Sequence, residues 1–527
     1  MAYRGSTIPI SCGQGGFCGA KSVDSVPNHM MVEPTRNIIY ERGGRRKRGG
    51  TVPLYEDPYA AGVNSIKKVK FADASEFLLA ATADGLIYKN AEDSIIDSED
   101  PLGTSFPVCM VYGDDRVFIA DGVNVPLAWP GTGEATAIST PAADFSTVPV
   151  FQMLLHKVGQ AEKMCALNRR GLYMSITGIF DGDMENFTGT GSLFFPITTN
   201  DGIGPVAMIE IGHQVVIFGK DKAYRLNDSH IDPDNWQISP AAWNGGVASW
   251  RLLVETPNDV FAMTDDGDIY SIAAVESYGD YKMASLTRAS WMFDWIKGNV
   301  DLSKIAQFHS CYDPTIAAAR FFVTLKGESS PSTCLLYYVE REPQDAWMVE
   351  DNMSAASGYN ALCSSAVLAS SGGSWDVFTG GVDGHVWKLN QVNRNDNGAG
   401  YYGGFKTPPD DFGDPRVSKA YNQGHVTTEA IGEHEIQVRM WVDDKPIPTG
   451  RSVDLSGAGV LLDDFELDDD ELTVSEIIEA SFKIGKRGRR LQYEFYTIGP
   501  DEDFYITQYM TDVKGRGRES KANDGGE

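Results

Sequence analysis

The sequence lacks any run of about 18 apolar residues, the length that a helix needs to cross a membrane. Its first residues, 1–6, also lack the apolar core of a secretory signal peptide. The seven cysteines are an odd number and are scattered along the chain, without the two closely spaced pairs of a zinc site. We therefore expect no membrane segment, reduced thiols and assembly in a cytoplasm.

Catalytic motifs are equally scarce. The 527 residues contain no Gly-x-Ser-x-Gly elbow, no His-Glu-x-x-His pair and no phosphate-binding Gly-Lys-Ser/Thr loop. The eight histidines occur without recurring partners, which is typical of structural residues. The sequence therefore predicts no enzymatic activity, no catalytic residue and no cofactor.

Acidic clusters are the remaining candidates for a metal site. They lie at residues 181–187, 265–268 and 461–471. The first two lack the complete spacing of a calcium loop, and turn formation explains their carboxylates. For residues 461–471 the alternatives are a calcium site, a surface for a basic partner, or a solvated loop, and a solvated loop is the commonest use of such a run. We predict no metal site.

Positive charge is in short supply, since 45 basic residues face 73 acidic ones and the net charge is −28. This balance argues against tight nucleic-acid binding, because phosphate contacts need surplus Lys and Arg. An acidic surface can still line a channel along which DNA slides without sticking. Solubility is the simpler explanation of the same charge.

The sequence does contain a repeated hairpin. In residues 258–272 an apolar strand is followed by an Asp-Gly turn and a second strand. The pattern recurs at 77–88 and 377–387, and more loosely at 116–122 and 215–224. Asp-Gly favours a tight hairpin, because glycine adopts a positive φ without a steric clash.

Together with further strand segments at 167–176 and 319–349, these hairpins make about seven irregularly spaced units between residues 59 and 390. The average is about 40–50 residues per unit, which is the length of a propeller blade. A parallel β-helix would need a shorter and stricter period. The sequence predicts an all-β chain, in which an irregular β-propeller of about six or seven blades precedes a C-terminal antiparallel β-sheet or sandwich. One helix is predicted, near residues 290–297.

Changes in composition divide the chain into four parts. We expect an N-terminal arm at 1–56, the propeller at 57–392, a C-terminal β domain at 393–515 and a disordered tail at 516–527. Strands of the C-terminal domain are predicted at 435–442, 475–484, 490–498 and 503–513. Apolar and polar residues alternate in the first and third of these strands, which indicates one buried and one exposed face.

Two basic clusters interrupt the acidic background and supply the candidate interface residues. They consist of Arg42, Arg45, Arg46, Lys47 and Arg48 near the N-terminus, and of Lys486, Arg487, Arg489 and Arg490 in the C-terminal β domain. One interpretation is a contact with phosphate or with an acidic protein surface. The other is a solvated loop whose glycines form turns.

Short segments in a fixed order carry a family resemblance. They are Gly15-Gly16, Asn37 with Tyr40, Arg45 to Thr51, the blade-like stretches 168–188 and 212–226, and finally 405–419 and 485–493. In this order they resemble the tail hub or nozzle proteins of short-tailed bacteriophages, also described as DNA-stabilisation proteins of the virion. Phe187 stands where the blade of that family usually has Trp. The resemblance extends over nearly the whole chain, although each segment that carries it is short.

The resemblance implies a structural protein of the virion tail, assembled in the cytoplasm of the host bacterium. It implies a homo-oligomeric ring of six copies below the portal and its adaptor proteins, with tail fibre, spike or tip proteins outside. Genomic double-stranded DNA would be retained by this ring and leave through its channel without specific binding. The two basic clusters would then contact a neighbouring subunit or an acidic adaptor surface.

Two other functions remain open. A receptor-binding or carbohydrate-binding or carbohydrate-cleaving tail propeller would bring aromatic residues and paired carboxylates together on one propeller face. A cytoplasmic interaction scaffold would be monomeric and more regularly repeated. The irregular blade spacing and the added C-terminal sheet argue against the scaffold.

Overall fold

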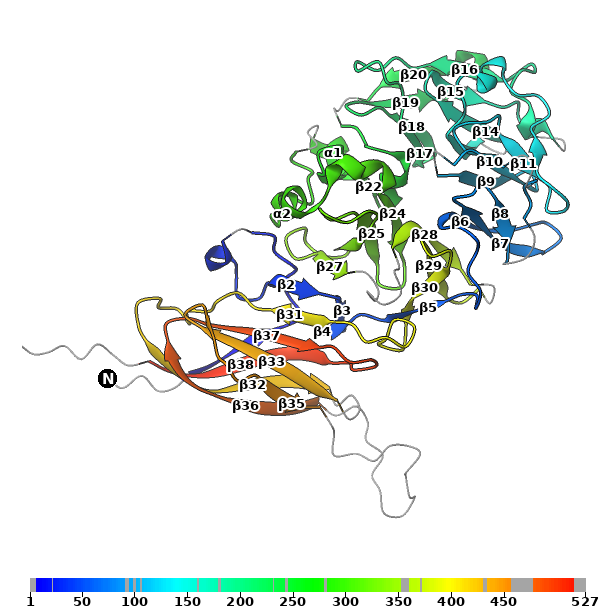
Figure 1. Ribbon diagram of the computed structural model, residues 1–527. Helices are drawn as coiled ribbons and strands as arrows, with labels where there is room; N and C mark the ends of the chain where they lie inside the picture. Colours follow the sequence, from blue (N-terminus) through cyan, green and yellow to red (C-terminus); the bar gives the residue numbers. More distant parts are fainter. Residues whose placement is uncertain are drawn as a thin grey trace, which may run out of the picture.

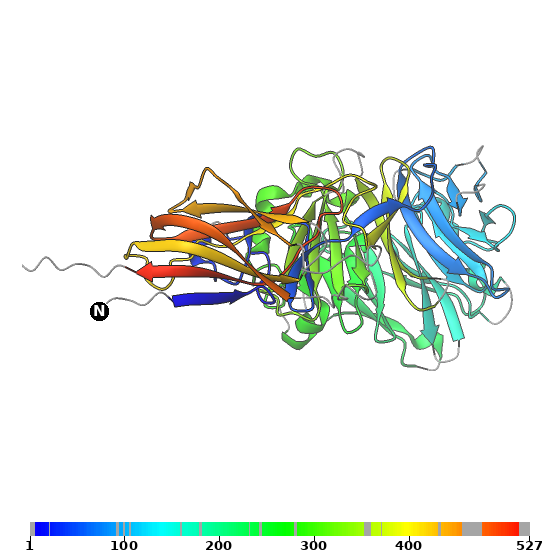
Figure 2. The ribbon, with the colours of Figure 1, turned by 90° about the horizontal axis from the view of Figure 1, so that it is seen from below.

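The computed structural model describes residues 6–20, 22–90, 94–97, 101–104, 107–158, 161–178, 182–230, 232–241, 245–278, 282–351, 360–369, 372–429, 434–455 and 477–515. These residues form a propeller and a smaller β-sandwich that lie against each other (Figure 1). Seen from below, the strands of the sandwich extend away from one side of the propeller (Figure 2). No helix within these ranges is long and apolar enough to span a membrane.

The propeller consists of seven antiparallel sheets of three or four strands among the described residues. The first four are β6 (Val63–Lys70), β7 (Glu76–Thr82) and β8 (Ile87–Lys89); β9 (Cys109–Gly113), β10 (Arg116–Ala120), β11 (Leu127–Trp129) and β12 (Thr136–Ala137); β13 (Gln152–Val158), β14 (Ala161–Asn168), β15 (Gly171–Met174) and β16 (Leu193–Pro196); and β17 (Ala207–Ile211), β18 (Gln214–Phe218), β19 (Ala223–Asn227) and β20 (Gln237–Pro240).

The remaining three sheets complete the ring. They are β21 (Leu253–Glu255), β22 (Val260–Met263) and β23 (Ile269–Ser271); β24 (His309–Asp313), β25 (Ala318–Val323), β26 (Thr333–Tyr338) and β27 (Trp347–Asp351); and β28 (Ala361–Leu368), β29 (Trp375–Gly381), β30 (Val386–Gln391) and β5 (Gly50–Pro53). The first strand of the last sheet, β28, contacts β6 of the first sheet. The predicted irregular β-propeller is confirmed.

The repeated hairpin is shaped by a Thr-x-Asp-Gly turn. The hydroxyl of Thr264 donates a hydrogen bond to the carboxylate of Asp266, and the next residue, Gly267, has a φ of 84°. The same hydroxyl–carboxylate bond forms at Thr82. Five residues, 264–268, separate the last paired residues of β22 and β23, so the turn is longer than the tight hairpin that Asp-Gly predicts.

Strand β5 closes the ring from the N-terminal side. It pairs antiparallel with β30 and is the outer strand of the seventh sheet. Residues 50–53 therefore belong to the propeller rather than to the predicted N-terminal arm. The pairing of two segments that are far apart in the sequence holds the first and last blades together through backbone hydrogen bonds.

Two short α-helices follow the fifth sheet, α1 (Ile272–Tyr278) and α2 (Met292–Asn299). The second matches the helix predicted near residues 290–297, displaced by two residues. The sequence reasoning missed α1, because Ile272 continues the apolar pattern of β23 and reads as strand. The side chains of Met292, Trp295 and Ile296 bury one face of α2 against the propeller core.

The C-terminal strands form the predicted sandwich, with two sheets of six strands each. The first sheet contains β3 (Ile38–Glu41), β4 (Gly44–Lys47), β38 (Tyr505–Gly515), β32 (Lys419–Glu429) and β36 (Ile477–Gly488), with β1 (Ser6–Ser11) beside β38. The second contains β2 (Val32–Arg36), β31 (Gly403–Lys406), β37 (Leu491–Thr497), β33 (Glu435–Val442), β34 (Lys445–Pro446) and β35 (Arg451–Asp454).

Four strands of the predicted N-terminal arm, β1 to β4, are therefore part of the sandwich. The predicted arm is therefore divided between the two β bodies. Strands β1 to β4 belong to the two sheets of the sandwich, and β5 belongs to the seventh sheet of the propeller (Figure 1). The predicted alternation holds in β33, where Ile436, Val438 and Met440 are buried. It fails in β37, all seven residues of which are buried, because both faces of this strand are covered.

Candidate interface residues at the domain junction

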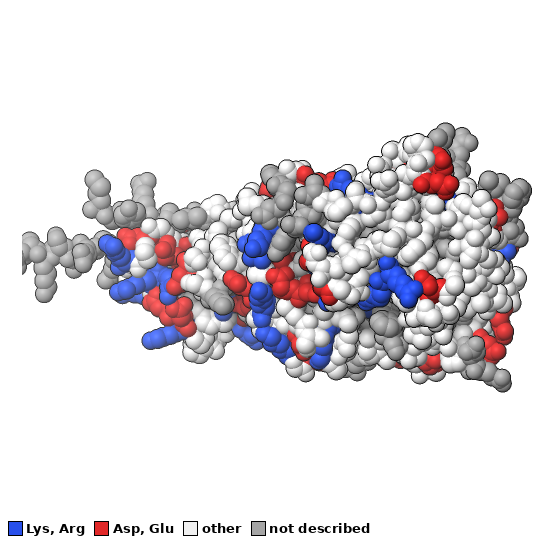
Figure 3. Space-filling view, turned by 90° about the horizontal axis from the view of Figure 1, so that it is seen from above, with Lys and Arg blue, Asp and Glu red and all other residues white. Residues whose placement is uncertain are grey.

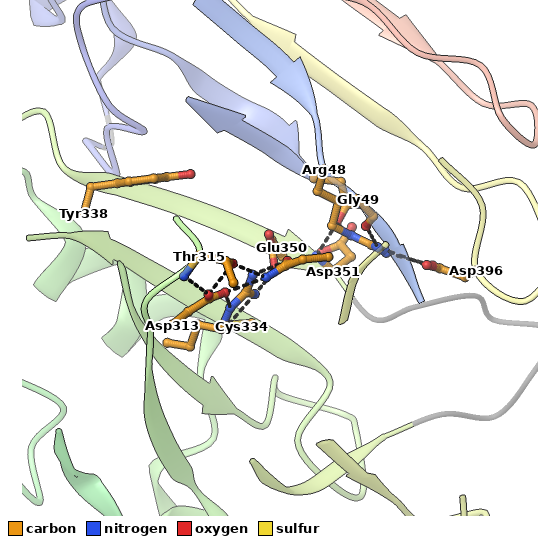
Figure 4. A network of polar contacts seen from close by, with 12 residues as sticks. Arg48, Gly49, Asp313, Thr315, Cys334, Tyr338, Glu350, Asp351 and Asp396 are labelled. Carbon is orange, nitrogen blue, oxygen red and sulfur yellow. Dashed lines mark hydrogen bonds and ion pairs between the residues drawn. The ribbon is translucent and has the colours of Figure 1, made fainter. Parts of the chain in front are cut away.

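The N-terminal basic cluster lies where the propeller and the sandwich meet. Arg48 is buried, and its guanidinium donates to both carboxylate oxygens of Asp396, at 3.0 and 2.7 Å. Figure 4 shows these two side chains pointing toward each other. Arg48 also donates to the Asn37 side-chain oxygen at 3.0 Å and lies 4.0 Å from the centre of the Tyr401 ring. A bidentate pair of this kind fixes both distance and orientation.

Lys47 is buried beside this pair. Its ammonium donates to the carbonyl oxygen of Gly499 at 3.1 Å and lies 4.3 Å from the centre of the Tyr401 ring. No carboxylate lies within ion-pairing distance of Lys47 among the described residues. Burial therefore dominates, and it lowers the pKa of Lys47 to about 8.

Arg45 and Arg46 point to opposite faces of β4. Arg45 is buried under the ring of Phe405, 4.7 Å from its centre, and donates to the carbonyl oxygen of Gln14 at 3.1 Å. Arg46 is partly exposed and pairs with Glu41 at 2.8 Å and with Asp503 at 2.7 Å. Asp503 in turn accepts from Arg394 at 2.9 Å, so one carboxylate joins cations from two distant segments.

The structure therefore places Arg45, Lys47 and Arg48 inside the chain rather than on a partner-facing surface. Each of these side chains has partners in the segment that links the propeller to the sandwich or in the sandwich itself. Their burial leaves them no access to phosphate or to another protein in this conformation. Arg42, whose side chain is exposed, stays a candidate for a partner contact.

The second basic cluster lies at the end of β36 and in the turn to β37. Lys486, Arg487 and Arg489 are exposed. Arg490 is half-buried and pairs with Asp444 at 2.7 Å and with Asp24. The carboxylate of Asp443 accepts from the backbone N–H groups of both arginines of the turn, at 2.7 and 3.0 Å, which holds the turn in place.

Seen from above, basic and acidic side chains alternate over the sandwich end of the molecule (Figure 3). The propeller part of the same face carries wide areas without charged side chains. The exposed cations of the sandwich thus lie on a surface of mixed charge. The electrostatic potential around each cation is weaker there than on a uniformly basic patch, because neighbouring carboxylates offset it.

A second polar network, which the sequence reasoning missed, lies inside the sixth blade. Buried Arg320 pairs with Asp313 at 2.8 Å and with Glu350, and it donates to Asn390 of the seventh blade at 3.0 Å. Asp351, which directly follows Glu350 in the chain, pairs with Arg36 of the sandwich at 2.9 Å. The signal available in the sequence was a charged residue within the otherwise apolar strand β25.

Two cavities lie near the axis of the propeller. Residues of the first strands β6, β9, β24 and β28 contribute to the wall of the first cavity, and loop residues from several blades line the second. One has a volume of about 210 Å³ and is lined by residues such as Arg251, His309 and Ser364. The other has a volume of about 350 Å³ and contains Asp265, the one carboxylate among the lining residues of both cavities within the described ranges. Asp265 pairs with Lys220 at 2.8 Å. The two carboxylates of a glycosidase do not meet in either cavity.

The acidic segments considered as metal sites are engaged in other contacts or lie outside the described residues. Glu185 pairs with Arg116 at 3.1 Å, and Asp268 pairs with Arg288 at 2.7 Å. No group of three or more His, Cys, Asp or Glu side chains that could hold a metal occurs among the described residues. Residues 461–471 and the tail 516–527 lie outside the described ranges.

Comparison with known proteins gives no assignment of family. No protein-family model matches the chain, and no curated protein sequence matches it. Similar solved structures include BBS1N in its complex with ARL6DN (TM-score 0.40, 10% identity, covering 66% of this chain and 99% of that one). The Cps50 (Swd1) β-propeller domain of Myceliophteria thermophila is another (TM-score 0.37, 9% identity, 66% and 100%). An exo-β-1,3-galactanase from Phanerochaete chrysosporium is a third (TM-score 0.26, 7% identity, 88% and 100%).

Proposed function

We propose that this chain is a structural protein of a short-tailed bacteriophage tail, forming a ring-shaped nozzle or hub through which genomic DNA is retained and ejected. The proposal follows from the order of short sequence segments, which resembles that of the tail hub or nozzle proteins. In it, six copies assemble below the portal and adaptor proteins and carry fibre, spike or tip proteins on the outside. The protein acts by holding a shape rather than by catalysis.

The observation that carries the proposal is the junction between the two β bodies. The N-terminal segment supplies four strands to the sandwich and one to the propeller, and buried ion pairs such as Arg48–Asp396 join the parts. A chain that crosses the junction in several places resists relative motion of the two bodies, since any movement must break paired strands or leave a charge unpaired. Such a building block suits a ring that must withstand the passage of DNA.

The charge of the chain supports the same proposal. With a net charge of −28, the average surface repels phosphate and lets duplex DNA pass without being held. The exposed cations Lys486, Arg487 and Arg489 are then available for an acidic surface on a neighbouring copy or on the adaptor.

Imaging tests the proposal directly. The purified full-length chain, alone and mixed with portal–adaptor complexes, is examined by negative-stain electron microscopy. We expect rings with a central hole wide enough for duplex DNA, or a new collar below the adaptor. Monomers in both samples would contradict the proposal, whereas rings that form only with the adaptor would show that the adaptor acts as template.

The alternative is a receptor-binding or carbohydrate-active tail propeller. It predicts binding on a glycan array and, for an enzyme, loss of activity when a carboxylate in an axial cavity is replaced. Asp265 is the residue to replace, because it is the carboxylate that the second cavity presents. Glycan binding by a chain that remains monomeric with portal–adaptor complexes would favour this alternative over the nozzle.

A further inference from the structure

The smaller axial cavity contains positive charge without a negative partner. Arg251 lies in the turn that leads into β21, and one of its guanidinium nitrogens donates to the carbonyl oxygen of Leu362. The backbone carbonyl of Arg251 accepts a hydrogen bond from the Ser310 hydroxyl at 2.7 Å, which holds the backbone of Arg251 against β24. Neither Arg251 nor Lys67, an exposed residue that also lines the cavity, has an acidic partner among the described residues.

The composition of the cavity wall differs from that of the whole chain. Thirteen residues from five blades line it, and none of them is Asp or Glu. In a chain with 73 acidic and 45 basic residues, a wall of this kind concentrates positive potential. The wall also contributes hydroxyl groups, among them Ser364 and Ser365.

His309 supports this wall as a neutral group. Its Nε2 lies 2.9 Å from the carbonyl oxygen of Ala361, which can only accept, so Nε2 carries the proton. Its Nδ1 therefore accepts from the Ser364 hydroxyl at 2.8 Å. Burial, reinforced by the nearby charge of Arg251, lowers the pKa of His309 well below its ordinary value. The net charge at the cavity therefore comes from Arg251 and Lys67.

A guanidinium that is withdrawn from water is normally stabilised by a carboxylate, as Arg48 and Arg320 are in this chain. Arg251, which is half-buried, has no such partner, and its partial burial lowers its pKa to about 10. The cavity volume of about 210 Å³ lies below the 300–1,000 Å³ that is usual for drug-sized ligands. It can hold several waters or one small anion.

We propose that this cavity is a binding site for a small tetrahedral oxyanion of the phosphate or sulfate class. Arg251 and Lys67 supply the charge, and Ser365 supplies a hydroxyl donor. Guanidinium and ammonium groups form their strongest hydrogen bonds with such oxygens. The site lies on the propeller axis of a single chain, so the proposal does not depend on ring formation.

Isothermal titration of inorganic phosphate into the full-length chain tests the site, with sodium chloride adjusted to hold the ionic strength constant. We expect one binding site per chain. Arg251→Met should abolish binding, and Lys67→Met should weaken it about tenfold, the loss that corresponds to about 1.4 kcal/mol. Glycerol phosphate titrated in the same way identifies the source, since equal affinity indicates a phosphoryl group on a larger molecule and weaker affinity indicates the free ion.

Arg416→Met is the matched control, because Arg416 is exposed on the far side of the junction and its substitution removes the same charge. This variant should bind phosphate like the unchanged chain. If Arg251→Met fails to fold, Lys67→Met and Ser365→Ala carry the test. Absence of binding heat in the unchanged chain, or affinity that is the same in the cavity variants and the control, would overturn the proposal.

Discussion

At the scale of single residues, the buried pair Arg48–Asp396 is an ion pair of the junction that is shielded from solvent on both sides. Arg48→Met removes the cation and leaves a buried carboxylate without its partner. We expect a loss of about 3–5 kcal/mol in the free energy of unfolding of the junction, because an uncompensated buried charge costs more than a lost contact. Urea unfolding followed by intrinsic fluorescence measures this loss.

The exposed residue Arg42 provides the control for this substitution, since Arg42→Met should change stability by less than about 0.5 kcal/mol. The double variant Arg48→Met/Asp396→Asn should recover part of the loss, because the remaining side chain is neutral. Equal stability of Arg48→Met and Arg42→Met would mean that the junction does not rely on the ion pair.

Lys47 gives the junction a pH dependence of defined sign. Burial lowers its pKa from the ordinary 10.5 to about 8, so between these values the unfolded chain binds the proton that the folded chain has lost. Stability must therefore rise as the pH increases from about 8 to 10.5, by an amount of the order of 2 kcal/mol. Below pH 8 both states are protonated, and the cost of burying the charge is present in full.

Comparison of the unchanged chain with Lys47→Met isolates this effect from the other groups that titrate at high pH. Urea unfolding at pH 7.5, 9 and 10 should show a difference in stability that favours Lys47→Met at pH 7.5 and shrinks as the pH rises. A difference that is constant with pH would show that Lys47 keeps an ordinary pKa in the folded chain.

At the scale of elements, the sequence predicts features that depend on neighbouring residues but not the pairing of strands that are far apart in the chain. The hairpins could be predicted, because the residues that form a Thr-x-Asp-Gly turn, such as 264–267, are consecutive in the sequence. The role of residues 44–53 could not, because their partners β38 and β30 lie hundreds of residues away. Arg45, Lys47 and Arg48 look like a solvated loop for the same reason, since the residues that bury them are absent from the local sequence.

Strand β5 offers a test of ring closure. The backbone N–H of Thr51 donates to the carbonyl oxygen of Asn395 at 3.2 Å, and its hydroxyl donates to Asp396 at 3.1 Å. Thr51→Pro removes both bonds, which hold β5 to the segment just after β30 rather than to β30 itself, and we expect a loss of about 3 kcal/mol. Hydrogen exchange measured by mass spectrometry should show faster exchange in β29 and β30 than in the sheets on the opposite side of the ring.

Glu56→Pro is the matched control for this change, because Glu56 is exposed just beyond the strand. It should leave the exchange of β30 unchanged. Uniformly faster exchange in all seven sheets of the Thr51→Pro variant would mean that the propeller opens as a single cooperative unit rather than at the seventh blade.

At the scale of the whole molecule, the proposed ring depends on surfaces that the folded chain leaves free. Of the nine basic residues considered as partner contacts, Lys486, Arg487 and Arg489 form the exposed group at one turn of the sandwich. A cationic turn on a chain of net charge −28 is attracted by the acidic surface of a second copy or of the adaptor. Charge reversal at this turn should therefore act on assembly and not on folding.

We expect Lys486→Glu/Arg487→Glu/Arg489→Glu to reduce ring or collar formation at least tenfold in protein concentration, which corresponds to about 1.4 kcal/mol. Mass photometry with portal–adaptor complexes measures the assembled fraction, and circular dichroism verifies that the β structure is retained. The control is Arg416→Glu, which reverses an exposed cation away from the turn. Because exposed charges are screened, raising the salt concentration should weaken assembly of the unchanged chain and leave the variant unaffected. Assembly of the triple variant at the same concentration as the control would exclude this turn from the interface and leave Arg42 as the exposed cation to examine.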